Sequence, residues 1–187
     1  LKNRRTLVTG AAGHIGRAIC TAMASHGSDL VLADISQTGL ESLAEQLQSD
    51  YEVDVIVKTV DLQDPKEIDH LNQQILNELD NLEVIVHSAA LVGTSDLKGW
   101  TCEFKDQSEV TWMKAIQVNL TSIFQITRDL QTLLSKSGSG SIVTISSIYG
   151  MVGPDMRIYG NTGMGHAAAY GASKAGLIQY TRWLSTV

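Results

Sequence analysis

The chain has 187 residues, of which 43% are hydrophobic, and it carries a formal net charge of -6 without a run of lysine or arginine. This size and composition predict one globular domain, residues 1–187, and the charge argues against a nucleic-acid partner, because phosphate binding needs clustered cations. No apolar stretch approaches the roughly 20 residues of a membrane-spanning helix and no signal segment opens the chain, so we expect a cytoplasmic protein without a membrane partner.

Five short apolar runs predict buried parallel strands. Each run is rich in Val, Ile and Leu and is bounded by polar residues or glycine. The runs cover Thr6–Thr9, Asp29–Ala33, Val53–Thr59, Leu82–His87 and Ser141–Ser146. Segments of helical period lie between them, so the sequence predicts an α/β fold with a doubly wound, Rossmann-like parallel sheet.

Three of the intervening segments place apolar residues on one helical face. Asp64 followed by Pro65 predicts the start of the third helix, with the aspartate as cap and proline at the first helical position. The three faces hold Ile15, Ala18, Ile19, Ala22 and Met23; then Leu40, Leu43, Ala44 and Leu47; then Ile68, Leu71, Ile75 and Leu79.

Two further helices and one long loop complete the chain. A helix is expected over about 108–134, and a last helix from near Ala167 almost to Val187. Between the fifth strand and this last helix, the segment 150–166 is irregular, which in a compact domain usually means that it is functional or disordered. It contains Gly150, Gly153, Pro154, Gly160, Gly163 and Gly165.

The first strand runs into a glycine-rich turn, Gly10-Ala11-Ala12-Gly13-His14-Ile15-Gly16, and a helix follows at once. Glycine is needed where a chain turns tightly and approaches a pyrophosphate, and the helix start offers free N–H groups to an anion. The order of strand, turn and helix therefore favours a dinucleotide site over a tight turn that binds nothing.

Asp34 ends the second strand, about 20 residues after the turn, where a carboxylate accepts hydrogen bonds from ribose hydroxyls. Because it would repel a 2′-phosphate, NAD is favoured over NADP, although an aspartate there could also cap the next helix. Asp61 and Leu62 follow the third strand and could reach the adenine, but a role for Asp61 in capping or turn formation is equally compatible with the sequence.

Tyr170 and Lys174 are four residues apart, so on a helix they share one face. A free phenol titrates near pH 10, and a neighbouring ammonium favours the phenolate, which makes proton exchange with an alcohol practicable. The same spacing also occurs on ordinary exposed helix faces.

Two polar positions strengthen the assignment. Ser146 and Ser147 follow the fifth strand, at the edge of the sheet where ligands of open α/β sheets bind, although they could simply begin a loop. Asn119 lies among apolar residues within the long helix, where a local backbone distortion holding a water is one explanation and a surface asparagine is the other.

These residues resemble the short-chain dehydrogenase/reductase family over essentially the whole chain. The matching features arrive in the family's order: Thr9-Gly10 with the glycine turn, Asp34, Asp61, Ala89-Ala90, Asn119, Ile145-Ser146-Ser147 and Tyr170-Gly171-Ala172-Ser173-Lys174. The resemblance implies a catalytic tetrad of Asn119, Ser147, Tyr170 and Lys174. It also implies cofactor contacts by Gly10, Gly13, His14, Ile15, Gly16, Asp34, Asp61, Leu62, Ala89, Tyr170 and Lys174, hydride transfer between a secondary alcohol or ketone and NAD, and a homodimer or homotetramer.

The chain departs from the usual pattern in four places. The turn reads TGxxGxxG, as in the family's nucleotide-sugar epimerases and dehydratases, rather than TGxxxGxG. His87-Ser88-Ala89-Ala90 replaces Asn-Asn-Ala-Gly. The gap from Ser147 to Tyr170 is long; Tyr159 is nearer the usual distance, but position 163 is glycine rather than lysine, so Tyr170 is favoured. The family's chains continue past the last helix with two more strands, which suggests a C-terminally incomplete domain.

Three functions fit these observations. The enlarged loop is similar to that of short-chain oxidoreductases found with bacterial polysaccharide and flagellin-glycan synthesis, which makes a sugar derivative one candidate substrate of an NAD-dependent dehydrogenase. An epimerase or dehydratase that keeps its NAD is the second function, and a non-catalytic dinucleotide-binding protein is the third. Neither metal nor disulfide is expected, because Cys20 and Cys102 lie far apart and the five histidines are scattered.

Overall fold

The computed structural model describes residues 1–93, 97–160, 162 and 164–187. The chain divides into two compact units, which we call the sheet unit (residues 1–89 and 122–145) and the helical unit (residues 90–121 and 146–187). The single domain expected from the sequence stays a prediction.

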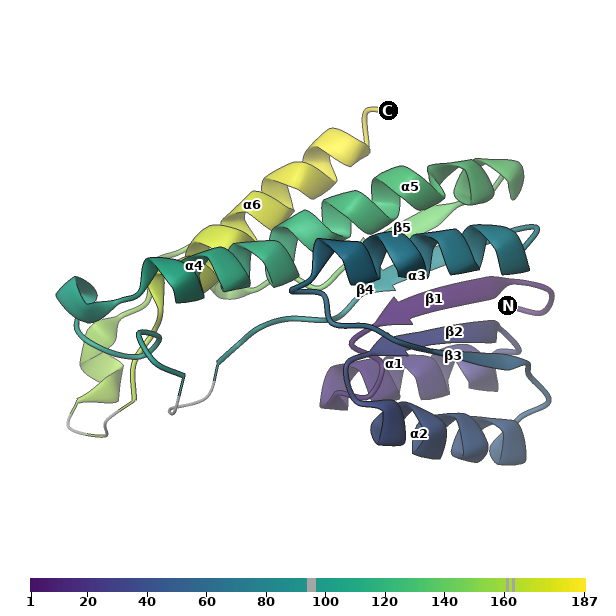
Figure 1. Cartoon of the computed structure of the whole chain (residues 1–187), viewed down its shortest axis with the longest axis horizontal. Coiled ribbons are helices and arrows are strands. Elements are labelled where there is room, and N and C mark those ends of the chain that lie inside the picture. The colour runs from purple at the N-terminus through teal and green to yellow at the C-terminus, as the bar shows by residue number, and fades with distance from the viewer. Residues whose placement is uncertain (94–96, 161, 163) are drawn as a thin grey trace. The chain divides into compact units, whose positions relative to one another are not determined.

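The sheet unit is built on five parallel strands in the order β3-β2-β1-β4-β5 (Figure 1). Thr9 lies opposite Ala33 on one side and His87 on the other, so the carboxyl ends of the three central strands form one edge. The strands are β1 (Arg5–Thr9), β2 (Asp29–Asp34), β3 (Val55–Thr59), β4 (Val84–His87) and β5 (Ser141–Thr144). The chain order reverses at β1, which is where such sheets bind ligands.

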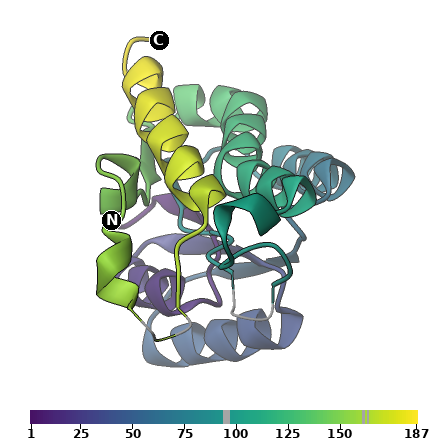
Figure 2. The same ribbon diagram turned by 90° about the vertical axis from the view of Figure 1, so that its left-hand side faces the viewer.

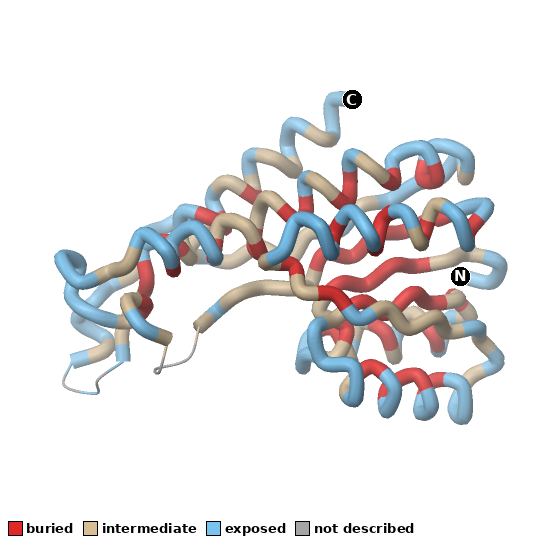
Figure 3. Tube along the Cα trace, viewed as in Figure 1, coloured by how far each residue is buried: buried red, intermediate tan, exposed pale blue. Residues whose placement is uncertain are grey.

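Four helices cover the sheet, α1 (His14–Ser25), α2 (Gln37–Asp50), α3 (Pro65–Glu78) and α5 (Ser122–Lys136). The first two lie on one face and the other two on the opposite face (Figures 1 and 2). The central strands are buried along most of their length (Figure 3). This arrangement confirms the predicted doubly wound, Rossmann-like sheet.

The faces of two helices are also confirmed, whereas the predicted face of α1 is confirmed only at Ile19 and Met23, which are partly buried against the core. Leu40, Leu43, Ala44 and Leu47 are buried on α2, and Ile68, Leu71 and Ile75 are buried on α3. On α1 the buried residues are Gly16, Cys20 and Ala24, whereas Ile15 is 57% exposed and Ala18 and Ala22 are exposed. The close approach of Gly16 to the carbonyl oxygen of Gly10 brings the stripe of small residues nearest to the sheet, with Ile19 and Met23 beside it.

Several predicted ends shift by one or two residues. Strand β3 begins at Val55 rather than Val53, because the N–H of Val53 turns back to the carbonyl of Tyr51. Strand β4 begins at Val84 rather than Leu82, and β5 ends at Thr144 rather than Ser146. The start of α3 is as predicted, since the carboxylate of Asp64 accepts the N–H of Lys66 and Pro65 opens the helix.

The helical unit contains α4 (Glu109–Ile116), a π-helix (Gln117–Thr121) and α6 (Ala168–Leu184). The continuous helix predicted over 108–134 is therefore interrupted in its middle. The segment 150–166, predicted to be irregular, contains a short 3-10 helix at Met156–Tyr159; its Gly163 lies outside the described residues. Two more 3-10 helices cover Phe104–Asp106 and Ile148–Gly150.

A small apolar core holds the helical unit together. Trp100, Ala115, Ala167 and Ala169 are buried in it, and Tyr170 packs against it. Among the described residues no helix is both long and apolar enough to cross a membrane.

Candidate active site

The glycine turn of the sheet unit depends on two close backbone approaches. Gly10 has a φ of +70°, and a Cβ there would lie 2.6 Å from the Cα of Ala89. A Cβ at Gly16 would lie 2.0 Å from the carbonyl oxygen of Gly10. Both positions therefore exclude any side chain, and Ala89, at the end of β4, forms one wall of the turn.

The start of α1 fits an anion. The helix begins at His14 after the N-cap Gly13, with no side chain capping its N–H groups, whereas Ser36, Asp64 and Ser108 cap α2, α3 and α4. His14 and Ile15 are exposed. Free N–H groups at a helix start, together with the helix dipole, are what a pyrophosphate requires, so the turn fits the dinucleotide predicted from the sequence.

Asp34 lies at the carboxyl end of β2 and binds the glycine turn. Its carboxylate accepts the N–H of Ala12 at 3.1 Å and the N–H of Ser36 at 3.0 Å. The alternative in which it caps the next helix is wrong, because the hydroxyl of Ser36 caps α2. Its two backbone hydrogen bonds fix the carboxylate beside the turn.

No lysine or arginine forms an ion pair with this carboxylate in the described part of the sheet unit. Arg17 donates to the carbonyls of Ala12 and Gly39, so its guanidinium is engaged by the backbone. Residues 34–50 contain no lysine or arginine, and Lys58 is paired with Glu78 at 2.6 Å.

Asp61 forms a turn after β3. Its carboxylate accepts the N–H of Gln63 at 2.8 Å and its carbonyl accepts the N–H of Asp64. The role in turn formation that the sequence left open for Asp61 is therefore confirmed. Leu62, the next residue, is buried. Contact of these two residues with an adenine stays a prediction.

His87, at the end of β4, is a buried histidine that the sequence analysis noted only as a departure from the family. Its Nε2 lies 3.1 Å from the hydroxyl of Thr127 on α5, and its Nδ1 has no partner among the described residues. Burial lowers its pKa to about 3. The ring is therefore neutral at pH 7 and joins the sheet to a helix.

In the helical unit, Tyr170 and Lys174 lie one turn apart on α6 as predicted. The Nζ of Lys174 lies 5.9 Å from the centre of the Tyr170 ring. Lys174 is 3% exposed, and burial lowers its pKa from 10.5 to about 8. The two side chains thus form a compact pair of phenol and ammonium, rather than part of an exposed helix face.

Asn119 lies in the π-helix and is fully buried, so the alternative of a surface asparagine is wrong. Its Oδ1 accepts the N–H of Leu91 at 2.6 Å, and its Nδ2 donates to the carbonyl of Leu91 and to the hydroxyl of Ser173. Ser173 in turn donates to the carbonyl of Tyr170. The predicted backbone distortion is present, and Asn119 acts on α6 through Ser173, a residue that the sequence analysis did not single out.

The two serines after β5 have different partners. The hydroxyl of Ser146 donates to the carbonyl of Lys174 at 3.2 Å, which anchors α6. Ser147 accepts the N–H of Tyr149 and caps the short 3-10 helix, which leaves its hydroxyl hydrogen available to a ligand. The helical unit therefore contains all four members of the predicted tetrad.

A cavity of about 590 Å³ lies in the helical unit beside the N-terminal half of α6. Its lining is largely apolar and comes from three segments: Cys102, Glu103, Phe104 and Gln107; Tyr149 to Pro154 with Met156; and His166, Ala168, Gly171, Ala172 and Ala175. The lining side chains that can form hydrogen bonds are those of Cys102, Glu103, Gln107, Tyr149 and His166.

His166 connects this cavity to Tyr170. Its ring stands edge-on to Tyr149, with centroids 4.5 Å apart, and to Tyr170, with centroids 5.6 Å apart. Desolvation lowers the pKa of His166. The sequence analysis treated this histidine as scattered, and no spacing in the sequence marks it.

Known proteins resemble this chain over nearly its whole length. A family model described as short chain dehydrogenase matches residues 4–186. The 3-oxoacyl-[acyl-carrier-protein] reductase of Aquifex aeolicus is 30% identical over 99% of this chain and 68% of its own length. The post-translational flagellin modification protein A of Campylobacter coli is 24% identical over 99% of this chain and 71% of its own.

Solved structures agree with the fold. The crystal structure of a short chain dehydrogenase from Shigella flexneri complexed with NADP has a TM-score of 0.85 and 26% identity, and it is matched over 100% of this chain and 72% of its own. The present chain thus spans about two thirds of the length of the first relatives that it matches.

Proposed function

Because the chain belongs to the short chain dehydrogenase family, we propose that it is an NAD-dependent oxidoreductase acting on a secondary alcohol or its ketone. The observation that carries this proposal is the pair of Tyr170 and the buried Lys174 on α6. A bound nicotinamide supplies the position that accepts or gives up the hydride. A homodimer or homotetramer is part of the proposal, and light scattering of the purified protein tests it.

Four side chains divide the remaining chemistry. Tyr170 moves the proton of the substrate oxygen, and the ammonium of Lys174 favours its phenolate. The hydroxyl of Ser147 donates to the same oxygen and holds it in place. Asn119 is a positioning residue that neither contacts the substrate nor transfers a proton. Its hydrogen bond to Ser173, which in turn bonds to the carbonyl of Tyr170, fixes the position of α6.

Tyr170→Phe tests this mechanism. We expect turnover of NAD with a panel of secondary alcohols, followed as absorbance of the reduced nicotinamide, to fall by at least about a thousandfold while NAD binding is unchanged. Tyr159→Phe is the matched control, because Tyr159 lies nearer the family's usual spacing but has no lysine four residues on. Wild-type turnover surviving in Tyr170→Phe, or lost in Tyr159→Phe, would contradict the assignment.

The same assay separates the alternatives. An epimerase or dehydratase would convert its substrate without net accumulation of reduced cofactor. A non-catalytic dinucleotide-binding protein would be stabilised against heat by NAD and would turn over none of the panel.

The preference for NAD is proposed on the carboxylate of Asp34, which is fixed beside the glycine turn by two backbone N–H groups and forms no ion pair with a described residue. A 2′-phosphate placed near it would be repelled by this carboxylate. This differs from the related structure that is complexed with NADP. We expect NADH to bind more tightly than NADPH, and Asp34→Ser to reduce the ratio of the two dissociation constants by about tenfold or more. Asp61→Asn is the control, and an equal change in both variants would refute the role of Asp34.

For the substrate we propose a carbonyl compound with an apolar body. The cavity beside α6 presents Met151, Val152, Pro154 and Met156 on one segment, and most of its lining is apolar, which suits an apolar body. A panel that pairs aliphatic and aryl alcohols with sugar alcohols of similar size tests this choice. A higher kcat/KM for the sugars would favour the sugar derivative considered from the sequence.

A further inference from the structure

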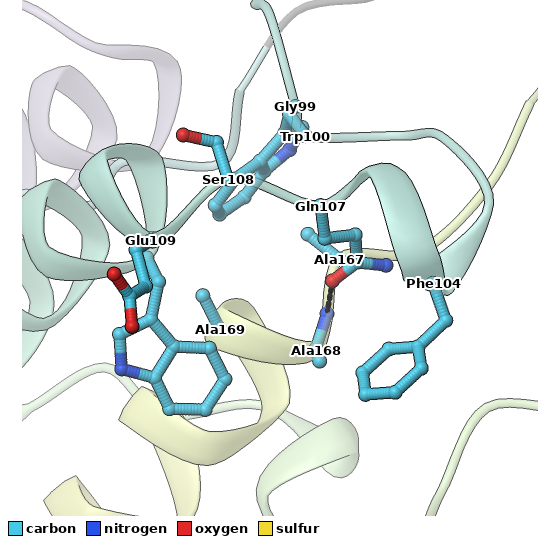
Figure 4. Close-up of a pocket in the computed structure, with 10 residues that line it drawn as sticks. Gly99, Trp100, Phe104, Gln107, Ser108, Glu109, Ala167, Ala168 and Ala169 are labelled. Atoms are coloured by element: carbon cyan, nitrogen blue, oxygen red, sulfur yellow. Dashed lines mark hydrogen bonds between the residues drawn. The ribbon is translucent and has the colours of Figure 1, made fainter.

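The helical unit holds a second, smaller cavity that the proposed reaction does not use. It measures about 180 Å³ and is lined by Gly99, Trp100, Phe104, Gln107, Ser108, Glu109, Trp112, Ala167, Ala168 and Ala169. A cavity of about 150 Å³ accepts a benzene ring. Figure 4 shows Glu109 on one side and Phe104 on the other, with Ala168 and Ala169 between them. None of the four proposed catalytic residues lines it.

Aromatic side chains form two of its walls. Trp112 is 39% exposed and Phe104 is 84% exposed, although both are large apolar residues. Trp112 lies one helical turn after Glu109 on α4, so its indole and the carboxylate share one face. An aromatic wall beside a carboxylate attracts cations, since the face of an indole ring carries partial negative charge.

Glu109 is the one charged residue among the residues that line the cavity. The carboxylate of Glu109 has no hydrogen bond or ion pair within the described residues. The segment 102–109 has three acidic residues and one lysine, and that lysine, Lys105, is paired with Glu103. An anionic ligand would therefore be repelled, and a cationic one would find a free partner in Glu109.

The amide of Gln107 has one group left for a ligand. Its Oε1 accepts the N–H of Ala168 at 3.1 Å. Gln107 thereby caps α6, because the N-cap residue Ala167 has no side chain that could do so. Its NH₂ group stands at the edge of the cavity and can donate to an acceptor on the ligand. Gln107, Ala168 and Phe104 also line the larger cavity, so the two cavities adjoin each other at these residues.

We propose that this smaller cavity binds an organic ammonium group carried on an apolar body the size of one aromatic ring. The ring packs between Phe104 and Trp112 over the alanines, and the ammonium pairs with Glu109. This inference does not rest on the proposed hydride transfer.

The first test compares three probes of one size: 2-phenylethylammonium, the neutral 2-phenylethanol and the anionic phenylacetate. Binding is followed through the indole N–H signals of the protein in ¹H–¹⁵N spectra, with that of Trp112 assigned by its disappearance in Trp112→Phe. We expect the ammonium to shift the indole signal of Trp112 and to leave that of Trp183 unchanged. Its affinity should be about two- to fivefold higher than that of the alcohol, and the difference from phenylacetate should be larger still.

Glu109→Gln supplies the second test, with Glu103→Gln as the matched control that removes the same charge from the neighbouring segment. We expect the affinity of Glu109→Gln for the ammonium to fall to its affinity for the alcohol. Glu103→Gln should still bind the ammonium more tightly than the alcohol. Equal affinities of alcohol and ammonium in the wild type, or equal effects of the two variants, would overturn the proposal. So would a Trp112 signal that shifts with protein concentration alone, since a second copy would then cover the cavity.

Discussion

The two units build their parts of the site in different ways. In the sheet unit, Gly10 and Gly16 create the glycine turn by lacking side chains, and backbone atoms touch directly. In the helical unit, the position of Tyr170 depends on buried polar side chains, chiefly Asn119 and Ser173. A site made of backbone is sensitive to added volume, whereas a site made of side-chain hydrogen bonds is sensitive to lost partners. The following predictions test this contrast.

Gly16→Ala should have the largest effect. The new Cβ would lie 2.0 Å from the carbonyl oxygen of Gly10 and 2.8 Å from the Cα of Ala11, so the turn or the start of α1 must move. We expect NAD affinity to fall by more than about a hundredfold and the free energy of unfolding to fall by about 4 kcal/mol or more. Calorimetric titration and chemical denaturation measure the two quantities.

Gly13→Ala is the control for this prediction, because the nearest atom to its new Cβ is 3.3 Å away. Since Gly13 is itself a predicted cofactor contact, the comparison uses stability: Gly13→Ala should lower the free energy of unfolding by only about 1 kcal/mol or less. Similar losses of unfolding free energy in both variants would show that glycine is not needed at position 16 for steric reasons.

Asn119→Ala should have the next largest effect, here in the helical unit. It leaves the partly buried N–H and carbonyl of Leu91 without the side chain of Asn119 and removes the hydrogen bond to Ser173. We expect the free energy of unfolding to fall by about 2–4 kcal/mol, with turnover reduced and NAD affinity retained. Asn72→Ala is the comparison in the sheet unit: this buried asparagine donates one hydrogen bond, to Asp129, and should lose about 1 kcal/mol. Equal losses would remove the contrast between the units.

The smallest effect concerns pH and His87. Its pKa of about 3 in the folded chain lies below the unfolded value of 6.5, so between these values the unfolded chain binds more protons. Stability from this group is complete above pH 6.5 and is lost as the pH falls toward 3. Denaturation at pH 7.5 and pH 5 should differ by about 2 kcal/mol from this residue.

His87→Asn removes the titrating ring and should reduce this difference between the two pH values. An unchanged difference in the variant would show that other groups control the acid sensitivity of the sheet unit.

The sequence predicted the sheet well, because the periodicity of apolar residues and the spacing of glycines are local patterns that need no knowledge of tertiary contacts. It missed Gly16, Cys20 and Ala24 as the most buried residues of α1, since the approach of Gly16 to Gly10 is a tertiary contact, and found only Ile19 and Met23 of the residues beside them. It placed Tyr170 and Lys174 on one helix face, but not the burial of Lys174. His166 and Ser173 carried no signal, because their roles arise from segments that only folding brings together.

The hydrogen bond from the Ala168 N–H to Gln107 links residues 61 positions apart in the chain. The first turn of α6 therefore receives this cap only when the segment around Gln107 lies against it. Closing so long a loop costs chain entropy and slows folding. The helix that carries Tyr170 should consequently be among the last parts of the helical unit to become protected from hydrogen exchange during refolding.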